Sequence, residues 1–166
     1  AGGLPTKLTT IYKGDAYGTG LRDVVYQTVQ FNKTSAKDNG GNWRDVMYAD
    51  PPVATTYADA ANAVVSKTTD LPHIIVLIGT AEVVEILKDI EAGWPASASF
   101  RPDYVLTDGA QLPELVKLIG GNNELRRRIL GTVPWSGTGN IDRVLESLLQ
   151  ERLRRQMESV GEESES

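Results

Sequence analysis

The apolar residues of this chain fall into short continuous runs and into stretches with helical spacing. The clearest run is Ile74–Ile78, which is followed at once by Gly79-Thr80 and then by a segment with apolar residues every three or four positions. A short apolar run is typical of a strand buried on both faces, and the spacing after it is typical of an amphipathic helix. The middle of the chain therefore predicts a strand that passes through a tight turn into a helix.

The same alternation of strand and helix continues along most of the chain. It predicts an α/β fold, a three-layer doubly wound parallel sheet of about five strands that resembles a Rossmann or flavodoxin-like lobe. The expected strands are residues 7–12, 44–48, 74–78, 103–106 and 129–133, and the expected helices are residues 21–31, 57–67, 81–92, 111–119 and 124–128.

The last part of the sequence has a different pattern. Residues 140–157 place Leu, Ile, Val and Met on one stripe and Arg and Glu on the other face. This spacing predicts a C-terminal amphipathic helix that packs on the sheet or on a partner chain. We expect a flexible lead-in over residues 1–6, a single lobe over residues 7–158 and a disordered acidic tail over residues 159–166.

Composition narrows the function classes. The chain has 166 residues, a formal net charge of -5 and no cysteine. One ordinary domain fits this length. An acidic chain argues against nucleic acid as a partner, because binding phosphates needs a basic face. The absence of cysteine excludes disulfides, zinc–thiolate sites and thiol nucleophiles. No apolar run approaches the roughly 20 residues that a membrane helix needs.

Several chemically capable side chains follow the expected strands. Ligands of doubly wound sheets bind beyond the carboxyl ends of the strands, so Asp15 and Asp108 should lie at the same edge. Two carboxylates there would bind either Mg²⁺ or a cationic ligand. A metal site for phosphoryl transfer needs a third oxygen ligand and a basic residue that binds the phosphoryl group. Lys13 is the one basic residue nearby. Tyr17 and Trp135 would either stack on a ligand or, in the case of Trp135, pack against the core.

Other chemistries find little support. Gly14, Gly18 and Gly20 do not have the spacing of a phosphate-binding loop, so a turn with a helix-capping residue is the alternative. His73 begins its strand and is therefore expected at the amino edge, away from any serine at the carboxyl edge. With no G-x-S-x-G motif either, we expect no acyl-transfer activity, and no cofactor is expected.

Four segments together resemble a known family. IYKGDAYGTGL, PHIIVLIGTAEVVEILKDIE, RPDYVLTDGA and RRRILGTVP occur in order over residues 7–134. They resemble the second lobe of the periplasmic binding protein type I superfamily, nearest to the extracellular ligand-binding receptors of branched-chain amino-acid transport. The resemblance implies a noncatalytic, periplasmic or extracytoplasmic solute-binding lobe of an ABC transport or signalling receptor, although this chain carries no signal peptide. An amino acid would be the ligand, and a membrane transporter or receptor the partner.

The resemblance also implies site residues. The D-A-Y-G match puts Asp15 and Tyr17 at the cleft, the I-G-T match adds Gly79 and Thr80, and the T-D-G match adds Asp108 beside Gly109. In this family an acid at the position of Asp108 often binds the amino group of the ligand.

The sequence departs from the family pattern in one large respect. The first lobe is absent, and a charged amphipathic segment stands where the chain would cross back to it. Two alternatives therefore stay open. One is a one-lobe interaction module that forms a homodimer or awaits its missing lobe. The other is an Mg²⁺-dependent flavodoxin-like phosphoryl-transfer enzyme.

Overall fold

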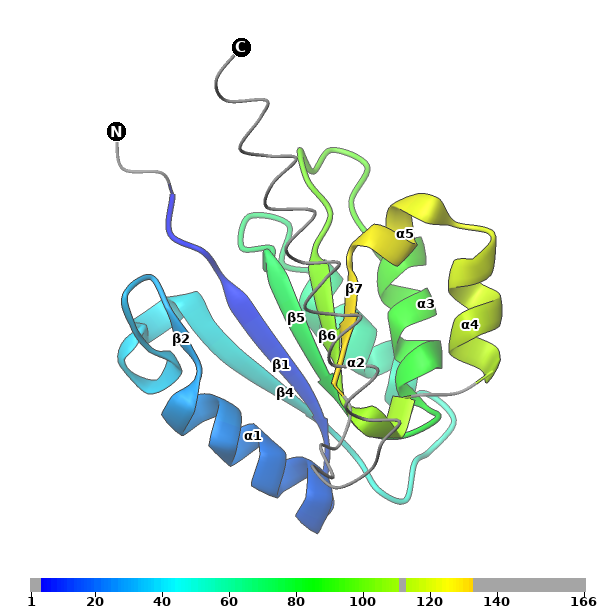
Figure 1. Ribbon diagram of the computed structural model, residues 1–166, viewed down its shortest axis with the longest axis horizontal. Helices are drawn as coiled ribbons and strands as arrows, with labels where there is room; N and C mark the ends of the chain where they lie inside the picture. The colour runs from blue at the N-terminus through cyan, green and yellow to red at the C-terminus, as the bar shows by residue number, and fades with distance from the viewer. Residues whose placement is uncertain (1–3, 111–112, 133–166) are drawn as a thin grey trace, which may run out of the picture. The chain divides into compact units, whose positions relative to one another are not determined.

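A computed structural model describes residues 4–110 and 113–132 (Figure 1). They lie in one compact unit that ends at Thr132. Trp135, the amphipathic segment 140–157 and the tail 159–166 lie outside the described residues, so the expectations for them stay predictions.

The core element is a parallel sheet of five strands in the order β4-β1-β5-β6-β7. The apolar run of β5 is its central strand, paired with β1 on one side and β6 on the other. The predicted doubly wound α/β fold is thereby confirmed. The strands are β1 (Leu8–Lys13), β4 (Trp43–Tyr48), β5 (Ile74–Ile78), β6 (Asp103–Leu106) and β7 (Ile129–Gly131).

Helices cover both faces of the sheet, as Figure 1 shows. On one face, α1 (Ala16–Thr28) packs against Leu8, Val76 and Ile78. The other face carries α2 (Thr56–Val65), α3 (Val83–Gly93), α4 (Pro113–Gly120) and α5 (Asn123–Arg127). Successive side chains of β5 point to opposite faces, so both of its sides are buried. None of the helices within the described ranges is long and apolar enough to cross a membrane.

The larger core lies between the sheet and α2 and α3. The apolar face predicted for the helix after β5 is fully buried there, since its five apolar side chains are each at most 1% exposed. Trp94 follows α3, and its indole N–H donates to the carbonyl of Phe100 at 2.8 Å. This tryptophan is buried and packs beneath the loop that carries Phe100. The five buried side chains of α3 are Val83, Val84, Ile86, Leu87 and Ile90.

The start of α1 differs from the expectation. The predicted loop over residues 13–20 is short, because α1 begins at Ala16 rather than at residue 21. Asp15 is its N-cap, and its Oδ1 accepts from the backbone N–H of Gly18 at 2.7 Å. The cap satisfies an amide that the first turn of a helix leaves without a partner. Gly18 and Gly20 thus serve as helix residues, Gly14 precedes the cap, and the turn with a capping residue is the correct alternative.

The connection after α1 also carries structure that the sequence did not predict. Residues 30–31 are not helical but form β2 (Gln30–Phe31), which pairs antiparallel with β3 (Thr34–Ser35). Asn32 and Lys33 between them have φ values of 51° and 69°. Positive φ at both central residues is what a tight hairpin turn requires. Two short 3₁₀ turns, η1 (Ala36–Asp38) and η2 (Gly40–Asn42), then lead into β4.

The α1 face of the sheet holds an apolar groove of about 420 Å³. It runs from α1 across β5 towards β6, and it reaches Asp108 at one end. The helical spacing of the apolar residues over 21–29 predicts that Val24 lies on the buried face of α1, but Val24 lines this groove and is 54% exposed. The groove is lined mainly by Leu21, Val25, Val29, Val76, Ile78 and Val105.

Candidate functional site

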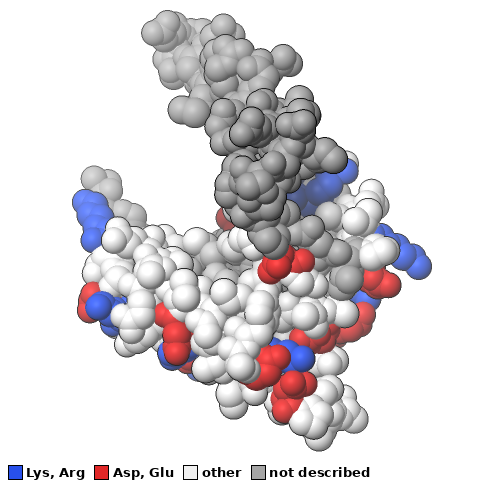
Figure 2. All heavy atoms as spheres, turned by 60° about the horizontal axis from the view of Figure 1, so that its bottom comes forward, with Lys and Arg blue, Asp and Glu red and all other residues white. Residues whose placement is uncertain are grey.

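The carboxyl ends of β1, β4, β5 and β6 meet at one edge of the sheet, at the bottom of Figure 1. We call it the carboxyl edge. Figure 2 brings this part of the molecule forward and shows acidic and basic side chains close together. The predicted residues Asp15, Tyr17, Gly79, Asp108 and their neighbours all lie in the segments that leave these strands.

Lys13 ends β1 and lies between two carboxylates. Its Nζ is 3.5 Å from Asp15 Oδ2 and 3.4 Å from Asp50 Oδ1. Partial burial would lower the pKa of Lys13, but the interactions with Asp50 and Asp15 outweigh it and raise the pKa. The ammonium group therefore stays charged and is neutralised within the protein. It is not poised to meet a phosphoryl group, as the phosphoryl-transfer alternative would require.

Tyr17 and Asp108 come from different ends of the lobe's sequence and meet at this edge. The Tyr17 hydroxyl donates to Asp108 Oδ1 at 3.0 Å, joining the first turn of α1 to the segment after β6. Asp108 begins the short turn η3 (Asp108–Ala110). Burial, together with the hydrogen bond to Asp108, raises the pKa of Tyr17. The phenol thus remains a neutral donor that holds the carboxylate in place.

Gly79 and Gly109 bring two backbone segments close together. A Cβ on Gly109 would lie 2.6 Å from the carbonyl oxygen of Gly79 and 3.2 Å from Thr80 Cγ2. A Cβ on Gly79 would lie 2.1 Å from the Tyr48 hydroxyl oxygen. Neither position has room for a side chain. The role that the structure gives these predicted residues is therefore close packing of the segments after β5 and β6.

Glu82 is a residue of this edge that the sequence did not single out. Its carboxylate accepts from the Thr80 hydroxyl at 2.6 Å, from the Thr80 amide at 3.1 Å and from the Tyr48 hydroxyl at 2.8 Å. Burial alone would raise the pKa of Glu82, but these hydrogen bonds outweigh it and lower the pKa. Thr80 is thereby turned towards Glu82. The only sequence signal was a Glu two residues after Thr80, at the start of the helix predicted over residues 81–92.

The arrangement favours a cationic ligand. Four carboxylates lie at the carboxyl edge, and Lys13 is paired with two of them. The chain passes from β1 to β4 on one side and then returns to β5 on the other. Ligands of doubly wound sheets bind where the strand order reverses in this way. The four acids are Asp15, Asp50, Glu82 and Asp108.

A metal site finds no such support among the described residues. No group of three or more His, Cys, Asp or Glu side chains there could hold a metal ion. Asp15 is used as a helix cap, and Asp108 is bonded to Tyr17. Hence the two carboxylates predicted as a pair are held by different partners.

His73 lies at the opposite, amino edge of the sheet, as its sequence position predicted. Its Nδ1 accepts from the backbone N–H of Lys7 at 3.0 Å, and its ring stacks on Phe100 with centroids 4.6 Å apart. It lies at the opposite end of the strands from the carboxyl edge and takes no part in that site.

Comparison of the chain with protein-family models, with curated proteins and with solved structures finds no match.

Proposed function

We propose that this chain is a noncatalytic solute-binding lobe that holds the ammonium end of an amino acid at its carboxyl edge. The observation that carries the proposal is the hydrogen bond from Tyr17 to Asp108, which fixes a carboxylate beside the reversal of strand order. An ammonium group binds well to a positioned carboxylate, because a charge removed from water needs a charged, hydrogen-bonded partner.

One lobe supplies only part of such a site. The excess of acidic side chains at this edge attracts the ammonium group of an amino acid but repels its carboxylate. In this proposal another lobe, or a membrane receptor partner, binds that carboxylate from the other side. The protein then works in an extracytoplasmic compartment, in line with the sequence resemblance. Binding by one lobe alone is weak for the same reason, since it makes only part of the contacts.

The test is an NMR titration of the full chain at millimolar concentrations of leucine and two analogues that each lack one charged group. Leucine and 3-methylbutylamine should shift the amide resonances of Tyr17 and Asp108, whereas 4-methylpentanoate should not. Asp108→Asn keeps an oxygen for the Tyr17 hydroxyl but removes the charge. It should weaken binding by roughly 10- to 100-fold, as for the loss of one hydrogen bond to a charged group.

The matched control is Asp103→Asn. Asp103 is an exposed acid at the amino end of the same strand β6, so the substitution makes the same chemical change away from the carboxyl edge. It should leave the titration unchanged. Equal binding of all three compounds, or the same loss in both variants, would contradict a site built on Asp108.

The homodimer alternative stays a prediction. The observation that favours it is the apolar groove beside α1, because contiguous apolar surface often marks an interaction site. Light scattering over a range of protein concentrations measures it directly. A mass that rises with concentration and falls again in Val24→Asp would support dimerisation through this groove, and a constant monomer mass would exclude it.

A further inference from the structure

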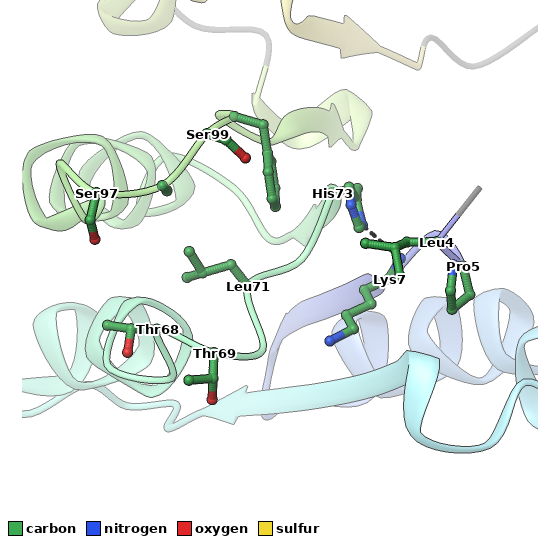
Figure 3. Close-up of a pocket in the computed structure, with 11 residues that line it drawn as sticks. Leu4, Pro5, Lys7, Thr68, Thr69, Leu71, His73, Ser97 and Ser99 are labelled. Atoms are coloured by element: carbon green, nitrogen blue, oxygen red, sulfur yellow. Dashed lines mark hydrogen bonds between the residues drawn. The ribbon is translucent and has the colours of Figure 1, made fainter.

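A pocket of about 500 Å³ lies at the amino edge of the sheet, at the opposite end of the strands from the proposed ligand site. Three separate segments form it: residues 4–7 before β1, residues 68–73 between α2 and β5, and residues 97–100 between α3 and β6. Figure 3 shows His73 and Lys7 on one side of this pocket, Leu71 at its centre and Ser99 opposite. Its volume falls within the range of small-molecule sites.

The walls of the pocket are largely apolar. Leu71 is buried in the main core, and Phe100 packs against the same core. Leu4 at the rim is 93% exposed, the highest value among the exposed large hydrophobic side chains of the described residues. A ligand in the pocket would cover this exposed apolar surface, which favours binding.

His73 lines the pocket and carries a side-chain hydrogen-bond donor. Its Nδ1 accepts from the Lys7 backbone N–H, so this nitrogen carries no proton. The proton of the ring is therefore on Nε2, which can donate. Stacking on Phe100 with an interplanar angle of 9° holds the ring in a fixed orientation.

Among the described residues that line the pocket, Lys7 is the one charged side chain, and it has a counter-charge. The Lys7 ammonium is paired with Asp70, and the same carboxylate lies 3.5 Å from Arg44. The other polar groups that line the pocket are hydroxyls, including those of Ser97 and Ser99. Burying a charged ligand here would leave its charge uncompensated, whereas a neutral polar group could be hydrogen-bonded.

We propose that this pocket binds a small uncharged molecule with an aromatic or branched apolar body and a carbonyl oxygen. The apolar body lies against Leu71 and Phe100, and the carbonyl accepts from His73 Nε2. The site is separate from the carboxyl edge and does not depend on the function proposed there.

The experiment uses three probes that share one ring and differ in charge: benzamide, benzoate and benzylamine. Each is titrated into the full chain, and amide shifts are followed by NMR. Benzamide should shift the resonances of Leu71, Ala98 and Phe100, and the two charged probes should bind at least several-fold more weakly. Preference for a charged probe, or no shift at these residues, would overturn the proposal.

Two variants test the assigned contacts. Ala98→Leu adds bulk to the pocket wall and should weaken benzamide binding by about tenfold or more. Ala58→Leu makes the same change on the exposed face of α2 and should have no effect. His73→Asn keeps an acceptor for the Lys7 amide but removes the Nε2 donor, so binding should fall by about three- to tenfold. Unchanged binding in Ala98→Leu, with its fold verified by circular dichroism, would also overturn the proposal.

Discussion

Gly18 and Gly20 lie two residues apart in α1, but a methyl group would meet different surroundings at each. A Cβ on Gly18 would lie 2.1 Å from the carbonyl oxygen of Lys13 and 2.8 Å from its carbonyl carbon. A Cβ on Gly20 would have no neighbour within 4 Å. Both residues are helical, so alanine brings the same gain in helix propensity. The two substitutions therefore isolate the cost of the contact between α1 and β1.

The magnitude follows from these distances. Alanine in place of glycine inside a helix is worth about 0.5–1 kcal/mol, so Gly20→Ala should raise the free energy of unfolding by that amount. At Gly18 the carbon and oxygen must separate by about 1 Å or more to reach ordinary contact. Because the oxygen belongs to the backbone of β1, the helix and the strand must shift, and such overpacking costs about 1–3 kcal/mol or more. We expect Gly18→Ala to lower the free energy of unfolding by about 2 kcal/mol.

Urea unfolding followed by far-UV circular dichroism measures both variants against the unsubstituted chain. Gly20→Ala should be more stable and Gly18→Ala less stable than the unsubstituted chain, so the two variants should differ by about 3 kcal/mol in free energy of unfolding. The dependence of that free energy on urea concentration should be similar in both. A Gly18→Ala variant as stable as the unsubstituted chain would refute the close approach of α1 to β1. Equal destabilisation by both substitutions would instead show that the helix does not extend over these residues.

Three further predictions concern single contacts. Asp15→Ala should lower the free energy of unfolding by about 1 kcal/mol in the same assay, and Asp15→Asn by less, because asparagine also caps helices. Glu91→Gln should cost about 2 kcal/mol at neutral pH, since it removes the charge bonded to Arg128 at 2.8 Å. Burial alone would raise the pKa of Glu91, but the hydrogen bonds from Arg128 and other neighbours lower it. The loss of stability in Glu91→Gln should therefore be complete above the ordinary glutamate pKa. It should shrink as the pH falls through the lowered pKa that Glu91 has in the folded protein. Gly79→Ala should destabilise the fold because its methyl group would meet the Tyr48 hydroxyl, and Tyr48→Phe in the double variant should restore part of the loss in thermal melting.

The sheet was predicted well from the sequence, because burial alone determines the runs of apolar residues that form its strands. The run of β5 is apolar on both faces, and the helix after it buries the five side chains that its spacing indicated. The start of α1 was placed too late, since glycines at 18 and 20 have low helix propensity. Gly18 is nevertheless part of the helix, and glycine is needed there because a Cβ would clash with the Lys13 carbonyl. Such a contact between neighbouring elements cannot be recognised from the local spacing of apolar residues in the sequence.

The candidate site was predictable in part. That Asp15, Tyr17 and Asp108 share one edge follows from their positions after parallel strands. Their partners do not follow, because contacts such as Tyr17 with Asp108 join residues 91 positions apart. Glu82 was missed for the same reason, since its bond to Tyr48 depends on how α3 meets the end of β4.

The strand order also governs how the chain reaches its fold. β1 lies between β4 and β5, and the amide of Lys7 just before it bonds to His73, 66 residues further along the chain. During synthesis β1, α1 and β4 are complete before β5 has been made. Pairing over such a separation is slow, because the entropy of closing a long loop is lost before the contacts form. Until β5 arrives, one edge of β1 is an unpaired template for strands of other chains, and aggregation competes with folding during that interval.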